Sequence, residues 1–196
     1  MTSGKGPRGE PVLNFGSATD FERWLEKNAT SSGPVWLRLR KRAAAASALT
    51  YKDAIESALC FGWIDGQKAR GDEQFWLQRF SRRGPRSRWS KINRERAERL
   101  AAKDRLRTPG REEIERAKAD GRWASAYEGQ RSARVPEDLQ KELDADPELG
   151  SAFATLSRAD RYSIIWRLND AKRPTTRERR LAKYLEMLRA LGGAHS

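Results

Sequence analysis

The chain is poor in the residues that build most catalytic and metal sites, with one cysteine and one histidine among 196 residues. Cys60 alone cannot form an intramolecular disulfide or a four-cysteine zinc site. His195 stands one residue before the C-terminus, where a catalytic base would lie on a fraying tail. Ser-His-Asp and Cys-His catalysis and histidine-rich metal sites are therefore not expected.

Long apolar runs and phosphate-binding signatures are also missing. No stretch approaches the roughly 18–20 apolar residues that a membrane-spanning helix needs, and the first residues lack the apolar core of a signal peptide. There is no P-loop, and no G-x-G-x-x-G fingerprint opens a helix. We therefore expect a cytoplasmic protein without a membrane span, a metal or a cofactor.

Positive charge is abundant and unevenly spread. The net charge is +13, with 37% hydrophobic and 34% charged residues. Residues 79–111 carry a net charge of +10 and residues 167–183 of +5, whereas residues 112–148 carry −5. This asymmetry creates a field that attracts polyanions. Solvated helix faces would show the same composition, so the pattern leaves both interpretations open.

Apolar periodicity and turn signals predict an α+β fold, with a small antiparallel sheet, flanking helices and a C-terminal helical region. Residues 1–12, rich in glycine, proline and charge, are expected to be a mobile tail. Residues 13–110 are expected to form the α+β domain, with a hairpin over residues 62–82. Residues 111–196 are expected to form the helical region, packed on that domain.

Local patterns refine this expectation. Alternation from Val35 to Lys41 predicts a half-buried strand, and helical spacing predicts a helix from Thr50 or Tyr51 to about Cys60. Residues 108–110 are interpreted as a break before a helix over residues 111–120. A stripe near the C-terminus predicts core packing against residues 158–168. Its members are Leu181, Tyr184, Leu185, Leu188 and Leu191.

Aromatic rings and polar groups interleave along the predicted hairpin. Trp63, Asp65 and Gln67 share one strand face because side chains alternate along a strand. Such a face is consistent with the polar floor of an aromatic-walled pocket. The alternative is that Asp65 caps a turn or pairs with an arginine. A lone carboxylate gives little support for acid–base chemistry, so we expect a binding protein, with an enzyme that uses Asp65 as general base as a further alternative.

An arginine-rich loop follows the hairpin. Guanidinium groups bind phosphate or carboxylate in bidentate fashion, and Trp89 offers a stacking surface. Ser90 begins a helix whose free N–H groups favour an anion. The alternative is a solvated loop. The expected ligand-binding residues are Trp63, Asp65, Gln67, Arg79, Phe80, Arg82, Arg83, Trp89, Lys91 and Asn93.

A second set of cations opens the last predicted helix, where positive charge opposes the helix dipole. These cations meet either a negative partner or the acidic residues 112–148 of the same chain. The expected partner is an anionic or aromatic small molecule or, alternatively, nucleic acid bound without sequence preference. The residues assigned to this anion or nucleic-acid patch are Arg86, Arg88, Lys172, Arg173, Arg177 and Arg180. The sequence leaves the oligomeric state open.

Four blocks of the sequence carry a resemblance to a known family. They are Ala58-Leu59-Cys60-Phe61-Gly62-Trp63-Ile64-Asp65-Gly66, Gln78-Arg79-Phe80, Trp89-Ser90-Lys91-Ile92-Asn93-Arg94-Glu95-Arg96-Ala97-Glu98-Arg99-Leu100 and Ala171-Lys172-Arg173-Pro174-x-Thr176-Arg177. Through these blocks the chain resembles the YdeI/OmpD-associated family, also called bacteriocin-protection proteins, over about residues 35–190. Ser81 departs from the family pattern, which has threonine followed by proline there.

The resemblance implies a small bacterial cytoplasmic protein linked to stress tolerance and to protection against antimicrobial peptides. It implies no established reaction and no agreed catalytic residues. A net charge of +13 repels cationic peptides, so direct capture of a cationic bacteriocin is not expected. Protection would be indirect, or it would involve an anionic or aromatic target.

Overall fold

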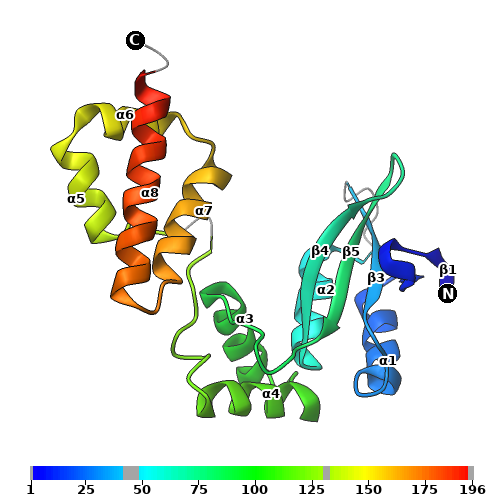
Figure 1. Ribbon diagram of the computed structural model, residues 1–196. Coiled ribbons are helices and arrows are strands. Elements are labelled where there is room, and N and C mark those ends of the chain that lie inside the picture. Colours follow the sequence, from blue (N-terminus) through cyan, green and yellow to red (C-terminus); the bar gives the residue numbers. More distant parts are fainter. Residues whose placement is uncertain (1, 42–48, 130–132, 194–196) are drawn as a thin grey trace. The chain divides into compact units, whose positions relative to one another are not determined.

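The computed structural model describes residues 2–41, 49–129 and 133–193, and it divides into two compact units (Figure 1). The N-terminal unit comprises residues 1–127 and the C-terminal unit residues 128–196. The N-terminal unit holds β1 (Thr2–Lys5), a 3-10 turn (Pro7–Gly9), β2 (Pro11–Leu13), α1 (Ala18–Asn28), β3 (Val35–Arg40), α2 (Tyr51–Cys60), β4 (Trp63–Arg70), β5 (Phe75–Arg82), α3 (Lys91–Ala102) and α4 (Thr108–Ala119).

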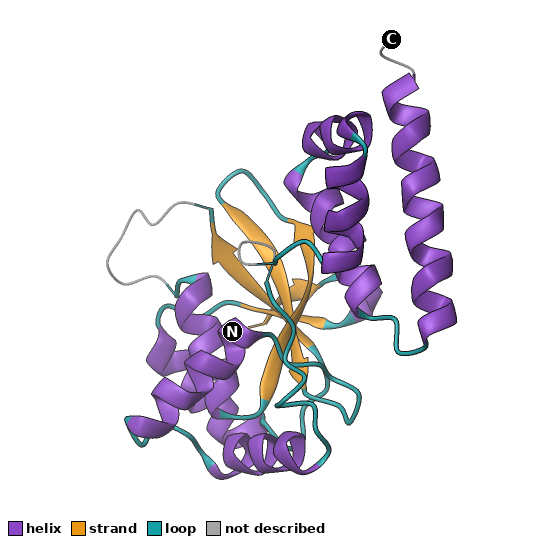
Figure 2. Cartoon of the chain, turned by 90° about the vertical axis from the view of Figure 1, so that its left-hand side faces the viewer, coloured by secondary structure: helices purple, strands orange, loops and turns teal. Residues whose placement is uncertain are grey.

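One sheet organises the N-terminal unit (Figure 2). Its strand order is β1-β2-β3-β5-β4. The β2–β3 pair is parallel, and the other three pairs are antiparallel. The α+β class is therefore confirmed, although the sheet is mixed rather than wholly antiparallel. The predicted hairpin is present as β4 and β5, which pair antiparallel with a bulge between Asp65 and Lys68.

The core of this unit lies between the sheet and its helices. Phe21 of α1, Leu59 of α2 and Phe80 of β5 are buried in one hydrophobic cluster, which also includes residues of α3 and α4. Side-chain caps begin three of the helices, since Ser17, Thr50 and Ser90 each accept a hydrogen bond from a backbone N–H three residues on. Thr50 and Ser90 are at helix starts that the sequence indicated. The helices thus present apolar faces to the sheet.

Two glycines allow the end of α2 to approach the start of α4. Gly62 has φ +74°, and a Cβ there would lie 2.7 Å from the carbonyl oxygen of Pro109. A Cβ on Gly110 would lie 2.3 Å from the carbonyl oxygen of Cys60. Residues 108–110 therefore form the first turn of α4 rather than a break, because a proline there loses no helical hydrogen bond.

The first residues differ from the mobile tail that their composition predicted. Residues 2–5 and 11–13 are strands of the sheet. The indole Nε1 of Trp36 donates to the carbonyl oxygen of Pro7 at 3.1 Å, and Glu10 accepts two hydrogen bonds of 2.8 Å from Arg79. This segment is held by Trp36 and Arg79, which are far away in the sequence. The glycine and proline content of the segment itself does not predict such contacts.

The C-terminal unit is helical where it is described. It holds α5 (Glu137–Ala145), α6 (Pro147–Thr155), α7 (Arg158–Asn169) and α8 (Pro174–Gly193). The predicted apolar stripe is confirmed for Leu185 and Leu188, which are buried in one cluster with Ile165 and Leu168 of α7. Leu191, by contrast, is 38% exposed. The unit boundary at residue 127 places α4 in the N-terminal unit, whereas the sequence placed residues 111–120 in the helical region.

No helix in the described ranges combines the length and the apolar character needed to cross a bilayer.

Candidate functional site

The aromatic walls expected for a hairpin pocket lie inside the core. Trp63 and Phe80 have no exposed surface, and the indole Nε1 of Trp63 donates to the carbonyl oxygen of Ala29 at 3.0 Å. Trp89 is 2% exposed. Strand alternation predicts which residues share a face, but it does not tell a face covered by helices from a face that lines a cleft. We therefore do not retain these rings as pocket walls.

The polar residues of the hairpin have partners within the chain or point to solvent. The Tyr51 hydroxyl donates to Asp65 Oδ2 at 2.5 Å, which ties α2 to β4. Burial, and then Asp65, raises the pKa of Tyr51 above its usual value, so the hydroxyl keeps its proton. Arg79 is held by Glu10 in a bidentate pair, and Gln67 is exposed. Asp65 is therefore held by a tyrosine of α2, rather than by the turn or the arginine that the sequence suggested as the alternative to a pocket.

The arginine loop separates into exposed and buried members. Arg82, Arg86 and Arg88 are exposed. Arg82 Nη1 donates to the carbonyl oxygen of Thr30 at 2.7 Å, and the Arg88 guanidinium lies 5.4 Å from the ring centre of Tyr127. None of these three arginines belongs to the lining of the two pockets described below.

The two predicted site residues at the start of α3, Lys91 and Asn93, form hydrogen bonds within the N-terminal unit. The backbone N–H of Lys91 donates to the carbonyl oxygen of Tyr127 at 2.8 Å. Asn93 Oδ1 accepts from Arg96 Nη1 at 3.0 Å. Neither residue shares a cavity with Trp63 or Phe80.

Arg83 and Trp89 are the two predicted site residues that the structure stacks together. The Arg83 guanidinium carbon lies 3.6 Å from the ring centre of Trp89, and Arg83 is only 6% exposed. Its Nη1 donates to the carbonyl oxygen of Arg88 at 3.2 Å, whereas its Nε and Nη2 have no partner. Burial lowers the pKa of Arg83 to about 10, an effect that Glu113 partly offsets.

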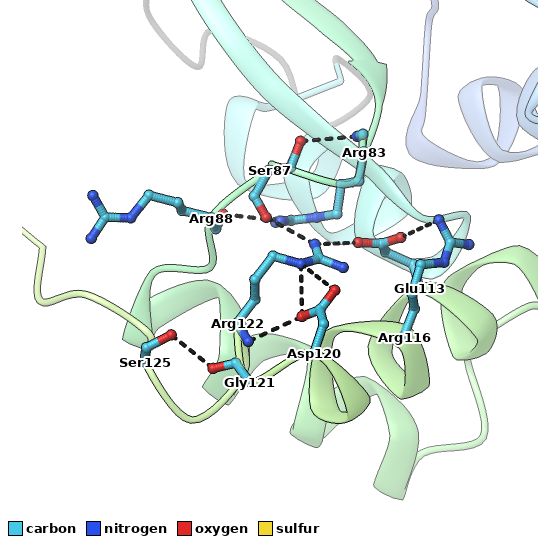
Figure 3. Close-up of polar contacts among 10 residues, drawn as sticks. Arg83, Ser87, Arg88, Glu113, Arg116, Asp120, Gly121, Arg122 and Ser125 are labelled. Carbon is cyan, nitrogen blue, oxygen red and sulfur yellow. Dashed lines mark hydrogen bonds and ion pairs between the residues drawn. The ribbon is translucent and has the colours of Figure 1, made fainter. Parts of the chain in front are cut away.

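Figure 3 shows the guanidinium groups of Arg83 and Arg122 beside each other, with Glu113 next to them. Glu113 is 3% exposed and pairs with Arg122 at 2.9 Å and with Arg116 at 3.0 Å. Arg122 also donates to the carbonyl oxygen of Ser87 at 3.0 Å. The network ties the loop after β5 to α4 and to the turn that follows α4. Its unpartnered nitrogens are shut off from solvent, so it holds the fold together rather than offering room for a ligand.

Replacing Arg83 by methionine is expected to leave the free energy of unfolding within about 1 kcal/mol of wild type, or to raise it. Methionine keeps the contact with Trp89, and the change removes a buried charge whose Nε and Nη2 have no partner. Urea denaturation followed by tryptophan fluorescence measures the change, with exposed Arg82→Met as the matched control. A loss of about 3 kcal/mol or more would show that the guanidinium itself stabilises the unit.

The C-terminal unit contains a cavity that combines cations with aromatic rings. This basic pocket has a volume of about 450 Å³ and lies between α7 and α8. Its lining consists of Trp166, Arg167, Arg179, Arg180, Lys183 and Tyr184. Four of these side chains are cationic, two are aromatic and none is a carboxylate. The volume falls in the range of small-molecule sites.

The cations of the basic pocket differ in how they are held. Arg180 Nη1 donates to the carbonyl oxygen of Arg167 at 2.5 Å and lies 3.8 Å from Asp170 Oδ2. Within the described ranges, the side chains of Arg167, Arg179 and Lys183 form no ion pair. One guanidinium is therefore fixed in place, and three further charges remain available around it.

The other predicted cations near α8 are placed differently. Arg177 forms a bidentate pair with Asp138, at 2.6 and 2.7 Å, and donates to the carbonyl oxygen of Leu168 at 2.9 Å. The Arg177 guanidinium lowers the pKa of Asp138 below its usual value. Arg177 therefore meets the acidic segment of its own chain and is not retained in the anion patch. Lys172 and Arg173 are exposed, just before α8 begins.

Most residues of the basic pocket and of the buried network were not singled out from the sequence. Arg179 and Lys183 are four residues apart and therefore lie on the same helix face, so their spacing indicates a local concentration of positive charge. Tyr184 was assigned to the core stripe, although it is only half-buried. Glu113 stands among Gly110, Ile114 and Ala117 on the buried face of α4, and an acid on such a face indicates a buried partner.

Comparison with family models assigns each unit. Residues 13–113, just over half of the chain, match the family described as "Domain of unknown function (DUF8412)". The chain belongs to the DUF8412 family. Three of the four sequence blocks that carried the resemblance lie within this DUF8412 match, together with the hairpin. The buried network extends past the match, because Arg116 and Arg122 lie beyond residue 113.

A second family model matches residues 132–190, which make up most of the C-terminal unit, and is described as "Bacteriocin-protection, YdeI or OmpD-Associated". This confirms the resemblance to that family, over a narrower range than residues 35–190. The block from Ala171 to Arg177 and the whole lining of the basic pocket lie within it. Comparison with curated proteins and with solved structures gave no match for this DUF8412 member.

Proposed function

We propose that the protein is a non-enzymatic binding protein of the stress- and antimicrobial-protection kind. It holds an anionic ligand with a flat ring in the basic pocket of the C-terminal unit. The observation that carries the proposal is the lining, in which two aromatic side chains meet four cations, of which, in the described part of the chain, only Arg180 is paired with a carboxylate, that of Asp170. Cations supply attraction for negative charge, and rings supply a stacking surface.

The expected affinity follows from the exposure of the pocket. Arg167, Arg179 and Lys183 are exposed, so each contributes only about 0.5–1 kcal/mol to binding an anion. Stacking on an aromatic side chain adds roughly 1–3 kcal/mol. Together these contributions amount to about 2.5–6 kcal/mol, which corresponds to a Kd between roughly 0.04 and 15 mM for a small ligand.

The protective role named in the description of the matched family would follow from binding a negative or aromatic target. With a net charge of +13, the protein repels a cationic peptide at long range. The basic pocket adds four cations locally. Protection by direct capture of a cationic peptide is therefore not part of the proposal.

Calorimetric titration with three related compounds tests the ligand class. Adenosine monophosphate carries both a ring and a phosphate, adenosine carries only the ring, and inorganic phosphate carries only the charge. We expect adenosine monophosphate to bind most tightly and adenosine most weakly. Raising the salt concentration should weaken adenosine monophosphate binding, because the pocket cations are exposed.

Charge reversal within α8 locates the site. Arg179→Glu is expected to weaken adenosine monophosphate binding about tenfold or more, since it both removes a cation and introduces a repulsive carboxylate. Arg189→Glu is the matched control, because Arg189 is exposed on the same helix but does not line the pocket. Both variants change the net charge equally. Equal weakening in both, or equal affinity for adenosine and adenosine monophosphate, would contradict the proposal.

Nucleic acid bound without sequence preference is the alternative, and exposed cations of the N-terminal unit favour it. Arg82, Arg86 and Arg88 are exposed within residues 79–111, whose net charge is +10. This alternative predicts that a single-stranded oligonucleotide binds far more tightly than adenosine monophosphate. The logarithm of its binding constant would fall with the logarithm of salt concentration by about 0.7 per neutralised phosphate. An oligonucleotide that causes no mobility shift at low salt would exclude it.

A further inference from the structure

A second cavity lies in the N-terminal unit, and its chemistry differs from that of the basic pocket. It has a volume of about 370 Å³ and opens between α3 and α4. Ala97, Leu106 and Ile114 contribute buried apolar surface, and Trp123 closes one end. We call it the Trp123 pocket. It belongs to the DUF8412 match only in part, because Ile114, Glu115, Lys118 and Trp123 lie beyond residue 113.

Small side chains on α3 create the hollow. Ala97 and Ala101 stand four residues apart, so they share the helix face that looks toward α4. A leucine at position 101 would extend into the space that alanine leaves open.

The Trp123 indole is held as a fixed wall. Its ring centre lies 4.8 Å from that of buried Trp89, with the planes at 63°. Its backbone N–H donates to the carbonyl oxygen of Ala117 at 2.9 Å, and its carbonyl oxygen accepts from Arg94 at 3.5 Å. A wall anchored in this way offers a flat face for a planar ring without a large loss of side-chain entropy.

The rim of the pocket has one acceptor that lacks a hydrogen bond. Lys118 pairs with Glu115 at 2.8 Å, and Arg111 pairs with Asp104 at 2.5 Å, so these charges are matched within the chain. The Glu98 carboxylate lies 3.7 Å from Arg94 Nε, which is too long for a hydrogen bond. Among the charges of the rim, Glu98 is therefore the one best placed to accept a donor from outside.

We propose that the Trp123 pocket binds a small aromatic amine, with its ring against Trp123 and its ammonium group at Glu98. An amine is favoured over an acid because Glu98, although ion-paired with Arg94 at 3.7 Å, accepts no hydrogen bond from the described residues, whereas Lys118 and Arg111 are hydrogen-bonded to their carboxylate partners. An ammonium group that lies near the face of the Trp123 indole is also attracted to that ring by a cation–π interaction. This site is independent of the basic pocket, whose lining favours the opposite charge.

Titration of the full-length, ¹⁵N-labelled protein with tryptamine, indole and indole-3-acetate tests the proposal. The indole N–H signals of the tryptophans are recorded, and Trp123 is assigned through Trp123→Phe. Saturable movement of the Trp123 signal is expected, with tryptamine binding more tightly than indole and indole more tightly than indole-3-acetate. A Trp123 signal that does not move, or an order in which indole-3-acetate binds best, would overturn it.

Three variants locate the site. Ala101→Leu fills the hollow and is expected to weaken tryptamine binding about tenfold or more. Ala102→Leu is the control, because Ala102 is exposed on the same helix and lies outside the lining. Glu98→Gln should abolish the preference for tryptamine over indole-3-acetate and leave indole binding unchanged. Equal losses in Ala101→Leu and Ala102→Leu, or an unaltered preference in Glu98→Gln, would contradict the assignment.

Discussion

Gly110→Ala is expected to destabilise the N-terminal unit by about 3 kcal/mol or more. The added Cβ would lie 2.3 Å from the carbonyl oxygen of Cys60 and 2.9 Å from that of Leu59. Both contacts are to backbone, so the clash is relieved only if α2 and α4 move apart. Alanine gains up to about 1 kcal/mol of helix propensity over glycine, which is too little to offset this strain.

Urea denaturation followed by tryptophan fluorescence measures the effect, because six of the seven tryptophans belong to the N-terminal unit. Gly192→Ala provides the control. Gly192 lies within α8, and a Cβ there would meet nothing closer than 4.0 Å. The control should be neutral or slightly stabilising. If Gly110→Ala were equally harmless, the close approach of α2 and α4 would be wrong.

Glu113→Gln is expected to cost about 3 kcal/mol, since it removes one of the two carboxylates that pair with Arg122 and leaves only Asp120. Glu113 is 3% exposed and is the carboxylate that pairs with both Arg122 and Arg116. Glutamine keeps the size of the side chain but not the charge. The neighbouring guanidinium of Arg83 would lose the carboxylate that most opposes the fall of its pKa.

Two comparisons sharpen this prediction. Glu115→Gln, on the same helix, removes an exposed pair with Lys118 and should change stability by less than about 1 kcal/mol. The double variant Glu113→Gln/Arg122→Met should be less destabilised than the sum of the two single variants, because it removes both members of the pair. Additive losses, or a loss in Glu113→Gln no larger than in Glu115→Gln, would show that the pair is not coupled.

Elements with strong local signals were predicted well from the sequence. The alternation of β3, the hairpin and the Ser90 cap depend on neighbouring residues, so a local pattern suffices for them. The strands β1 and β2 were missed because they are short and their pairing depends on Trp36 and Arg79, far along the chain. The boundary between the units lies after residue 127 rather than after residue 110. The buried face of α4 is difficult to recognise in the sequence because charged residues make up much of this helix.

The sequence predicted a site that combines arginine with tryptophan along the hairpin and the loop after it. Trp63 and Phe80 are core residues, so the hairpin does not supply the walls of such a site. The pocket that combines these residue types lies between α7 and α8, where Trp166 and Arg179 are thirteen positions apart in sequence. Which helices face each other depends on long-range packing, and residue types alone do not specify it.

The most direct test of the proposed function is the movement of the tryptophan indole N–H signals on addition of adenosine monophosphate. Trp166 is the one tryptophan of the seven that lines the basic pocket. Its signal, assigned through Trp166→Phe, is expected to move in a saturable way that Arg179→Glu weakens and Arg189→Glu preserves. A Trp166 signal that stays fixed at saturating ligand, while a tryptophan of the N-terminal unit moves, would contradict the account.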